Sequence, residues 1–236
     1  MKKNEFHPNT ILILFTGILI TTILGFHPKY TSKFPEFEGI SSLIHFHGNV
    51  MMSWYVLLFT QLLLIKFHLH KWHRLVGKIG IIIGPLAVYT MGLVTKMQYY
   101  REIKIQPESS LLGHFTVEIP LMILFSVFLI LAFVHRKIPA THMRYMIGTA
   151  LVMIGPGLGR TIIFTSGLHP LLGVASMFFT PTIIASVLLY FDYKNKRNIR
   201  PFTTITVLLS LQIICGIIQN TSIWQGFAKT FVNTFF

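Results

Sequence analysis

The sequence predicts an all-α, polytopic membrane protein built as a bundle of seven transmembrane helices. Of its 236 residues, 53% are hydrophobic and 11% are charged, whereas an average soluble domain carries about a quarter charged residues. The apolar residues gather in seven runs, and each run is long enough to cross a hydrocarbon core of about 30 Å. The segments between these runs are short, so we expect residues 1–236 to form a single integral membrane domain.

The expected spans lie at about residues 9–26, 42–65, 79–95, 113–134, 144–165, 171–191 and 202–220. The first follows a basic start, as the apolar core of a signal peptide would. Its run is long, no cleavage-site pattern of small residues follows, and more spans come after it, so we expect it to be retained. Prolines occur inside several spans, where they kink helices and free backbone carbonyls.

The distribution of Lys and Arg predicts an N-in, C-out topology. With the N-terminus in the cytoplasm, thirteen Lys and Arg residues fall on the cytoplasmic side and six on the other, while Arg160 lies inside a span. Cytoplasmic loops of membrane proteins carry such an excess. The interpretation also accounts for the net charge of +13, because basic loops meet anionic lipid headgroups. We expect the bacterial inner membrane as the location and no nucleic acid as a partner.

Polar side chains follow one face of the second span. Steps of three or four residues place them in register on a helix, and the stripe consists of His47, Met51, Trp54, Leu58, Gln61, Ile65 and His68. A helix that contacts only lipid has no need of His, Trp and Gln in register. We therefore expect Trp54 and Gln61 to line the inside of the bundle, with Gln61 bonded to the backbone of a neighbouring helix.

Three ionisable residues are expected at one depth near the outer end of the bundle. His47, Glu118 and Arg160 each lie five residues inside a span, which corresponds to about 7–8 Å at 1.5 Å per residue. Charged groups in a bilayer usually face the bundle interior and a partner. An ion pair between Glu118 and Arg160 is the simplest expectation. It either locks two helices together or lines a polar pocket.

The histidines near this level also suggest a metal or haem site. His114 lies one turn from Glu118 on the same face, His45 flanks His47, and His169 follows the fifth span. Imidazole and carboxylate groups bind several transition metals. His47, His114, Glu118, His45 and His169 are therefore candidate metal ligands. Alternatively, His47 and His114 are candidate axial ligands of haem b.

Several motifs carry a resemblance to a known group of proteins. They are His45-x-His47-Gly-x-x-Met-x-x-Trp54 with Gln61, His73-Arg74-x-x-Gly77, and His142-Met-Arg144-Tyr-Met146 leading to Gly155-Pro156-x-x-Gly159-Arg160. This pattern resembles a family of uncharacterised multi-pass bacterial inner-membrane proteins, loosely similar to cytochrome-b-like and haem-copper-oxidase-associated membrane proteins. The resemblance implies a shared site near His47, Arg74 and Arg160. It implies no particular reaction.

Two classes of function follow from these observations. In the first, the chain is a haem- or metal-binding membrane protein with a redox role, and its outer-leaflet pocket contains His47, His114, Glu118 and Arg160. In the second, it is a non-enzymatic binding or transport protein, or an accessory subunit of a membrane complex. The same pocket then holds a small molecule. Contact between Glu118 and Arg160 with no cavity beside them would argue against small-molecule binding.

Overall fold

The chain folds into a bundle of long helices, which a computed structural model describes for residues 8–236. The helices are α1 (Pro8–Phe26), α2 (Ser42–Lys66), α3 (His70–Gly77), α4 (Gly80–Glu102), α5 (Glu108–Val134), α6 (Pro139–Thr165), α7 (Pro170–Lys194), α8 (Arg200–Ile217) and α9 (Ser222–Phe235). No β-strand occurs among the described residues. Seven segments are long and apolar enough to span a membrane, with α3 and α4 counted as one. The predicted fold class is confirmed.

Each predicted span corresponds to a helix, but several helices are longer than predicted. The α4 helix continues to Glu102, α5 begins at Glu108, and α6 begins at Pro139, so each extends about one to two turns beyond its apolar run. Hydropathy marks the part of a helix that suits hydrocarbon, whereas backbone hydrogen bonding continues into the polar flanks. The last span ends at Ile217, earlier than predicted, and the separate helix α9 was not predicted.

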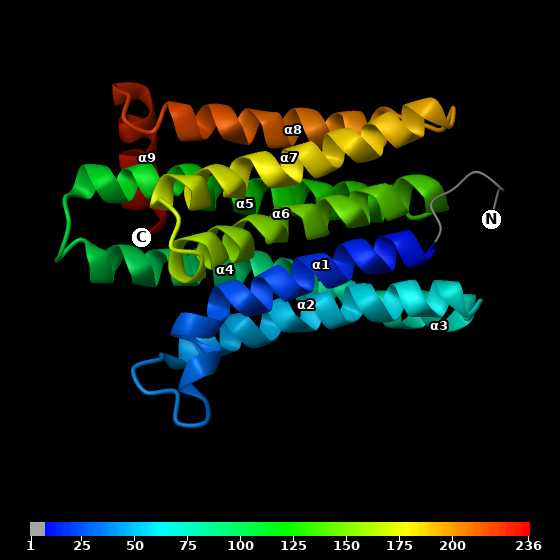
Figure 1. Cartoon of the computed structure of the whole chain (residues 1–236), viewed down its shortest axis with the longest axis horizontal. Helices are drawn as coiled ribbons and strands as arrows, with labels where there is room; N and C mark the ends of the chain where they lie inside the picture. Colours follow the sequence, from blue (N-terminus) through cyan, green and yellow to red (C-terminus); the bar gives the residue numbers. More distant parts are fainter. Residues whose placement is uncertain (1–7) are drawn as a thin grey trace.

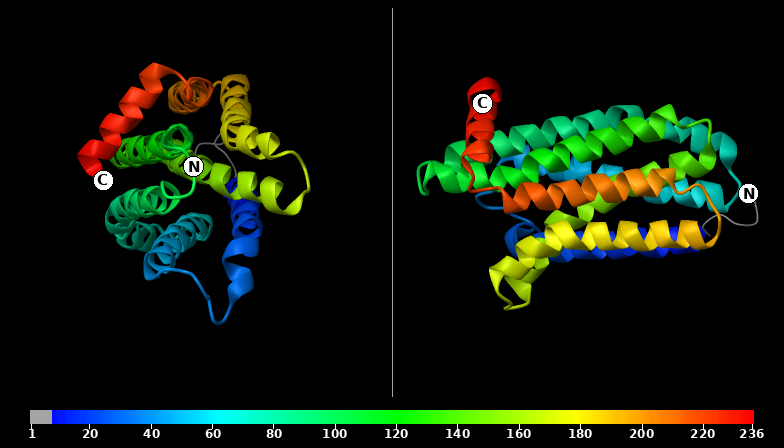
Figure 2. Two further views of the ribbon diagram at one scale, coloured as in Figure 1. Left: turned by 90° about the vertical axis from the view of Figure 1, so that its left-hand side faces the viewer. Right: turned by 90° about the horizontal axis from the view of Figure 1, so that it is seen from above.

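The spans run nearly parallel, and α6 is the central one (Figures 1 and 2). It contacts α1, α5, α7 and α8, and it is the most buried of the spans. The α9 helix crosses one end of the bundle, here called the α9 end, while α3 lies at the opposite α3 end. The described chain starts at the α3 end and finishes at the α9 end, as an odd number of spans requires. Which end faces the cytoplasm stays a prediction from the basic residues.

Glycines let α6 approach its neighbours closely. A Cβ atom on Gly157 would lie 2.7 Å from the Thr22 Cα of α1, and one on Gly155 would lie 2.9 Å from the Met177 carbonyl oxygen of α7. Small residues commonly allow such backbone contacts between membrane helices. On the same side, the Thr161 hydroxyl donates to the Thr21 carbonyl at 3.2 Å. These contacts fix α6, and therefore Arg160, against α1.

The α9 helix is held against the start of α5. Trp224 Nε1 donates to the Leu112 carbonyl at 2.8 Å, and Trp224, Ala228 and Val232 are buried on the face that packs on the bundle. The Thr221 hydroxyl caps the helix by accepting from the Trp224 amide. Figure 2 shows α9 lying across the bundle end rather than along its axis. This orientation is typical of a helix at the membrane interface.

Candidate functional site

The three ionisable residues expected at one level come together at the α9 end, from three different helices. His47 of α2 and Glu118 of α5 each lie within electrostatic reach of Arg160 of α6. His47 and Arg160 are partly buried, and so is Glu118. The arrangement places one imidazole, one guanidinium and one carboxyl group inside the membrane-spanning part of the bundle, where ionisable side chains are costly and usually functional.

The expected ion pair between Glu118 and Arg160 is wrong, because the structure shows no contact of 4.0 Å or less between these two described side chains. Arg160 Nη1 instead donates to the Pro156 carbonyl of its own helix at 3.1 Å. The guanidinium group also lies 4.6 Å from the centroid of the Phe26 ring, an arrangement typical of a cation–π contact. The physical reason is the close packing of α6 on α1, which directs Arg160 toward the end of α1.

Glu118 faces a polar cavity between α4 and α5. The Thr95 side chain of α4 lies close to its carboxyl group and lines the same cavity. The cavity has a volume of about 200 Å³ and is lined by Thr95, Gln98, Tyr99, Arg101, Glu102, Gln106, Leu111, His114, Phe115 and Glu118. His114 and Glu118 therefore share one cavity, as their spacing on one helical face suggested, whereas His47 and Arg160 lie outside its lining.

Near the site, Glu102 is already engaged by neighbouring side chains. Arg101 Nε donates to Glu102 Oε1 at 2.8 Å, and Gln106 Nε2 donates to Glu102 Oε2 at 3.1 Å. Both oxygens of Glu102 thus have donors. Of the two carboxyl groups that line the cavity, Glu118 is the one without a basic side chain in direct contact, within the part of the chain that the structure describes.

His47 is oriented by a buried threonine on α4. His47 Nδ1 and the Thr90 hydroxyl lie 3.0 Å apart, and the same hydroxyl donates to the Ala87 carbonyl at 3.0 Å. A hydroxyl has a single proton to donate, so Thr90 accepts from His47 and Nδ1 carries the hydrogen. In a neutral ring, this assignment leaves His47 Nε2 with the lone pair, which is the form that binds a proton or a metal ion.

The rest of the stripe on α2 is internal, but its members differ in role. Trp54 is fully buried against Phe125, with ring centroids 5.4 Å apart, and its Nε1 has no hydrogen-bond partner among the described residues. With its amide oriented to satisfy both groups, Gln61 accepts from the Gly77 amide at 3.0 Å and donates to the His73 carbonyl at 3.0 Å. Gln61 therefore bonds the backbone at the break between α3 and α4, as predicted.

The stripe ends earlier than the spacing suggested. Ile65 is still part of α2, but the helix ends at Lys66. His68 lies beyond the helix end, where its φ of 60° is not helical. It is exposed at the α3 end and therefore does not continue the inner face. The helical spacing was correct only as far as the helix itself extends.

The other candidate metal ligands lie in separate surroundings. His45 Nδ1 is 2.8 Å from the Tyr30 hydroxyl, and its ring packs edge-on against Phe37. His169 Nδ1 accepts from the Leu171 amide at 3.3 Å and caps α7 in an exposed position. Among residues 8–236, no three His, Cys, Asp or Glu side chains come together in a group that could hold a metal ion. The five nominated residues therefore do not form one ligand set.

Sequence reasoning missed the most tightly paired charges among the described residues, which lie at the α3 end. Arg144 of α6 donates to Asp192 of α7 through two bonds, with Nε to Oδ2 at 2.6 Å and Nη2 to Oδ1 at 2.9 Å. The side chains are 1% and 0% exposed, and Arg197 Nη1 lies 3.5 Å from Asp192 Oδ1. The fifth predicted span began at Arg144 and the sixth ended one residue before Asp192, so both partners fell at span ends and not inside the bundle. The available signal was that Asp192 is the chain's single aspartate, set among basic residues directly after an apolar run.

Comparison with protein families, with curated proteins and with solved structures finds no match. The resemblance carried by the His45–Gln61 and Gly155–Arg160 motifs therefore stays a prediction.

Proposed function

We propose that this chain is a membrane-embedded binding protein for a small polar molecule, which occupies the cavity between α4 and α5 at the α9 end. The observation that carries the proposal is the position of Glu118, which faces this cavity and makes no ion pair with Arg160. A volume of about 200 Å³ corresponds to roughly six or seven water-sized volumes of about 30 Å³ each. The cavity suits a solute of a few heavy atoms.

The lining favours a ligand that donates hydrogen bonds. Glu102 already accepts from Arg101 and Gln106, which leaves the Glu118 carboxyl group as the strongest acceptor for a bound molecule. A carboxylate binds N–H and O–H donors most strongly when the donor is charged. A small amine or guanidine is therefore the ligand chemistry that fits, and His114 supplies a second polar contact from the same wall.

Arg160 sets the electrostatic surroundings of Glu118 without filling the cavity, and His47 lies within electrostatic reach of Arg160. Both are held by other partners, Arg160 by Pro156 and Phe26 and His47 by Thr90. A cationic ligand would compete with Arg160 for the Glu118 charge. This competition favours reversible binding, which a carrier or sensor requires.

Ligand-dependent thermal stability of the detergent-purified protein tests this function. With methylammonium as the probe, we expect the melting temperature to rise with concentration, because a ligand at 100 times its Kd adds about 2.7 kcal/mol of stability. Glu118→Gln should remove the rise, and Glu36→Gln, at an exposed loop residue, should keep it. Acetate serves as the matched anion and should have no effect. An equal response of the Glu118→Gln variant and the unaltered protein would refute the assignment.

The haem or metal function remains a second candidate because of one observation, the orientation of His47. Its Nδ1 hydrogen points to Thr90, so Nε2 is presented as a ligating nitrogen, as in metal sites where a second group fixes the histidine tautomer. A bound haem b or transition metal would give a visible absorbance band or a stoichiometric metal content in the purified protein. A colourless, metal-free preparation with intact helical structure would remove this candidate.

For location, we propose the bacterial cytoplasmic membrane, with the α9 end and its cavity facing outward. The excess of Lys and Arg at the α3 end supports this orientation. An accessory role in a larger membrane complex stays a prediction, and co-purification of stoichiometric partner subunits would support it.

A further inference from the structure

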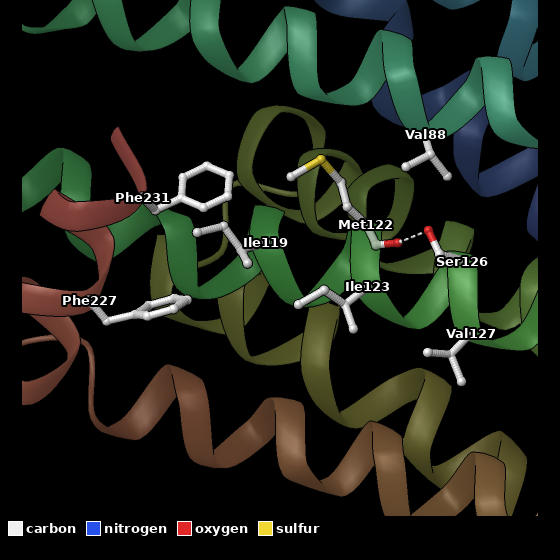
Figure 3. A pocket seen from close by; sticks show the side chains of 8 residues that line it. All are labelled: Val88, Ile119, Met122, Ile123, Ser126, Val127, Phe227 and Phe231. Atoms are coloured by element: carbon white, nitrogen blue, oxygen red, sulfur yellow. Dashed lines mark hydrogen bonds between the residues drawn. The ribbon is translucent and has the colours of Figure 1, made fainter. Parts of the chain in front are cut away.

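A second cavity lies deeper along α5, and its lining is almost entirely apolar. It has a volume of about 470 Å³ and is lined by Val88, Ile119, Met122, Ile123, Ser126, Val127, Phe227 and Phe231 (Figure 3). These residues come from α4, α5 and α9. Ser126 is the one hydroxyl among them, and it donates to the Met122 carbonyl at 2.7 Å. The lining therefore offers an occupant no free side-chain donor.

The position of this apolar groove places it at the level of the hydrocarbon. Val127 is seven residues from the end of α5, and Ile119 is eleven from its start, so both lie at least about 10 Å inside the helix at 1.5 Å per residue. The α9 residues Phe227 and Phe231 close the groove toward the α9 end. Any occupant must therefore enter from the bilayer and must be apolar.

The groove is separate from the polar cavity of the proposed function. Phe115 lines the polar cavity and Phe231 lines the groove, and their rings pack with centroids 6.3 Å apart. The two linings share no residue, so the groove and the polar cavity are distinct sites. The groove accordingly needs an occupant of its own.

We propose that this groove is a binding site for one acyl chain of a membrane phospholipid, held as a resident lipid. Its volume of about 470 Å³ equals roughly sixteen water-sized units of about 30 Å³ each, and a methylene group is close to this size, so the groove has room for most of one chain. Figure 3 shows the lining residues of α5 spread from Ile119 to Val127, with Phe227 and Phe231 of α9 beside the Ile119 end. A chain lying parallel to the spans would follow that direction.

The shape of the groove distinguishes this lipid from the lipids that cover the rest of the bundle. Lipid tails gain nothing from the hydrophobic effect inside a bilayer, so retention depends on the number of van der Waals contacts. A chain in the groove contacts α4, α5 and α9, whereas a chain on a flat helix face contacts one wall. Ile123 and Phe227 are 54% and 50% exposed, so substantial apolar surface remains for these contacts.

Native mass spectrometry of the detergent-purified chain tests the site. We expect the unaltered protein to retain one phospholipid mass after detergent exchange and Ile123→Trp to lose it, because the larger side chain fills the groove. Ile130→Trp is the matched control, since Ile130 lies two turns further along α5, is 59% exposed and is not part of the lining. Retention of the lipid by Ile123→Trp, or a retained mass that is not a phospholipid, would overturn the proposal.

A second measurement keeps the test valid if Ile123→Trp fails to fold. The unaltered protein is reconstituted in phosphatidylcholine vesicles that contain a phospholipid with a photoreactive group on its acyl chain. Adducts should concentrate on peptides that contain Met122, Ile123 or Phe227. An even distribution of adducts over all lipid-facing spans would overturn the proposal and would leave the amine-binding function untouched.

Discussion

Two buried polar clusters, one at each end of the bundle, differ in how completely their charges are paired. At the α3 end, Asp192 accepts two bonds from Arg144 and lies 3.5 Å from Arg197 Nη1. At the α9 end, Glu118 and Arg160 make no direct contact of 4.0 Å or less, and Glu118 faces a cavity. Both clusters join different spans, yet only the first has the geometry of a structural pair.

The difference teaches how to separate structural from functional charges inside a membrane protein. A fully buried bidentate Arg–carboxylate pair leaves no room for a ligand. Removal of either partner leaves the other charge buried without compensation. An ionisable group that faces a cavity without a direct counter-charge keeps its bonding capacity for something else. On this reasoning, the α3-end cluster holds α6 and α7 together, and the α9-end cluster is the proposed binding site.

The largest effect is expected from breaking the structural pair. Asp192→Asn removes the carboxylate that neutralises the buried Arg144, and disrupting one partner of such a pair typically costs about 3–5 kcal/mol. The free energy of unfolding in detergent, from denaturant titration followed by circular dichroism, measures this cost. Glu38→Gln, at an exposed loop position, serves as the control. A loss under about 1 kcal/mol for Asp192→Asn would show that the pair is not structural.

A smaller effect is expected from the packing that positions Arg160. Gly157→Ala introduces a Cβ that would lie 2.7 Å from the Thr22 Cα, so α1 and α6 must separate at a cost of about 1–3 kcal/mol. The distance between two spin labels, one on α1 and one on α6, should increase as well. Gly17→Ala on α1 is the control, because nothing lies within 4 Å of its added Cβ. Equal stability of the two variants would contradict the close-packing account of the α9 end.

The smallest effect is expected at the break between α3 and α4. Gln61→Leu removes the hydrogen bonds to the Gly77 amide and the His73 carbonyl, and side-chain hydrogen bonds between membrane helices are worth about 0.6–1.7 kcal/mol. Hydrogen exchange should increase first at the Gly77 amide. If that amide exchanged at the same rate in Gln61→Leu, the proposed bond would be absent in solution. Ile65→Leu, at a partly buried position of the same helix, is the matched control.

The sequence predicted the fold well because the dominant signal was local. Apolar runs of sufficient length identify spans regardless of which helices are neighbours, and all seven were located. Helix α9 was not predicted, because an amphipathic helix that lies across the bundle end carries no continuous apolar run. The extra turns of α4, α5 and α6 were not predicted for a related reason, which is that the residues in these turns are largely polar.

The candidate site could be predicted only in part. Counting along spans brought His47, Glu118 and Arg160 to one level, and spacing placed His114 on the same face as Glu118. Counting does not give the rotation of a helix about its own axis, so the direction of Arg160 toward Phe26 was not predictable. The pair of Arg144 and Asp192 depends on the packing of α6 against α7, which no local pattern contains.

The most direct test of the central claim is a pair of double-mutant cycles on unfolding free energy, one for each cluster. Arg144→Gln with Asp192→Asn should give a coupling energy of about 1.5–3 kcal/mol, within the range found for residues in direct contact. Arg160→Gln with Glu118→Gln should give a clearly smaller coupling energy, because these two groups interact only through space and share no bond. Equal coupling energies at the two ends would contradict the distinction between a structural pair and a binding site.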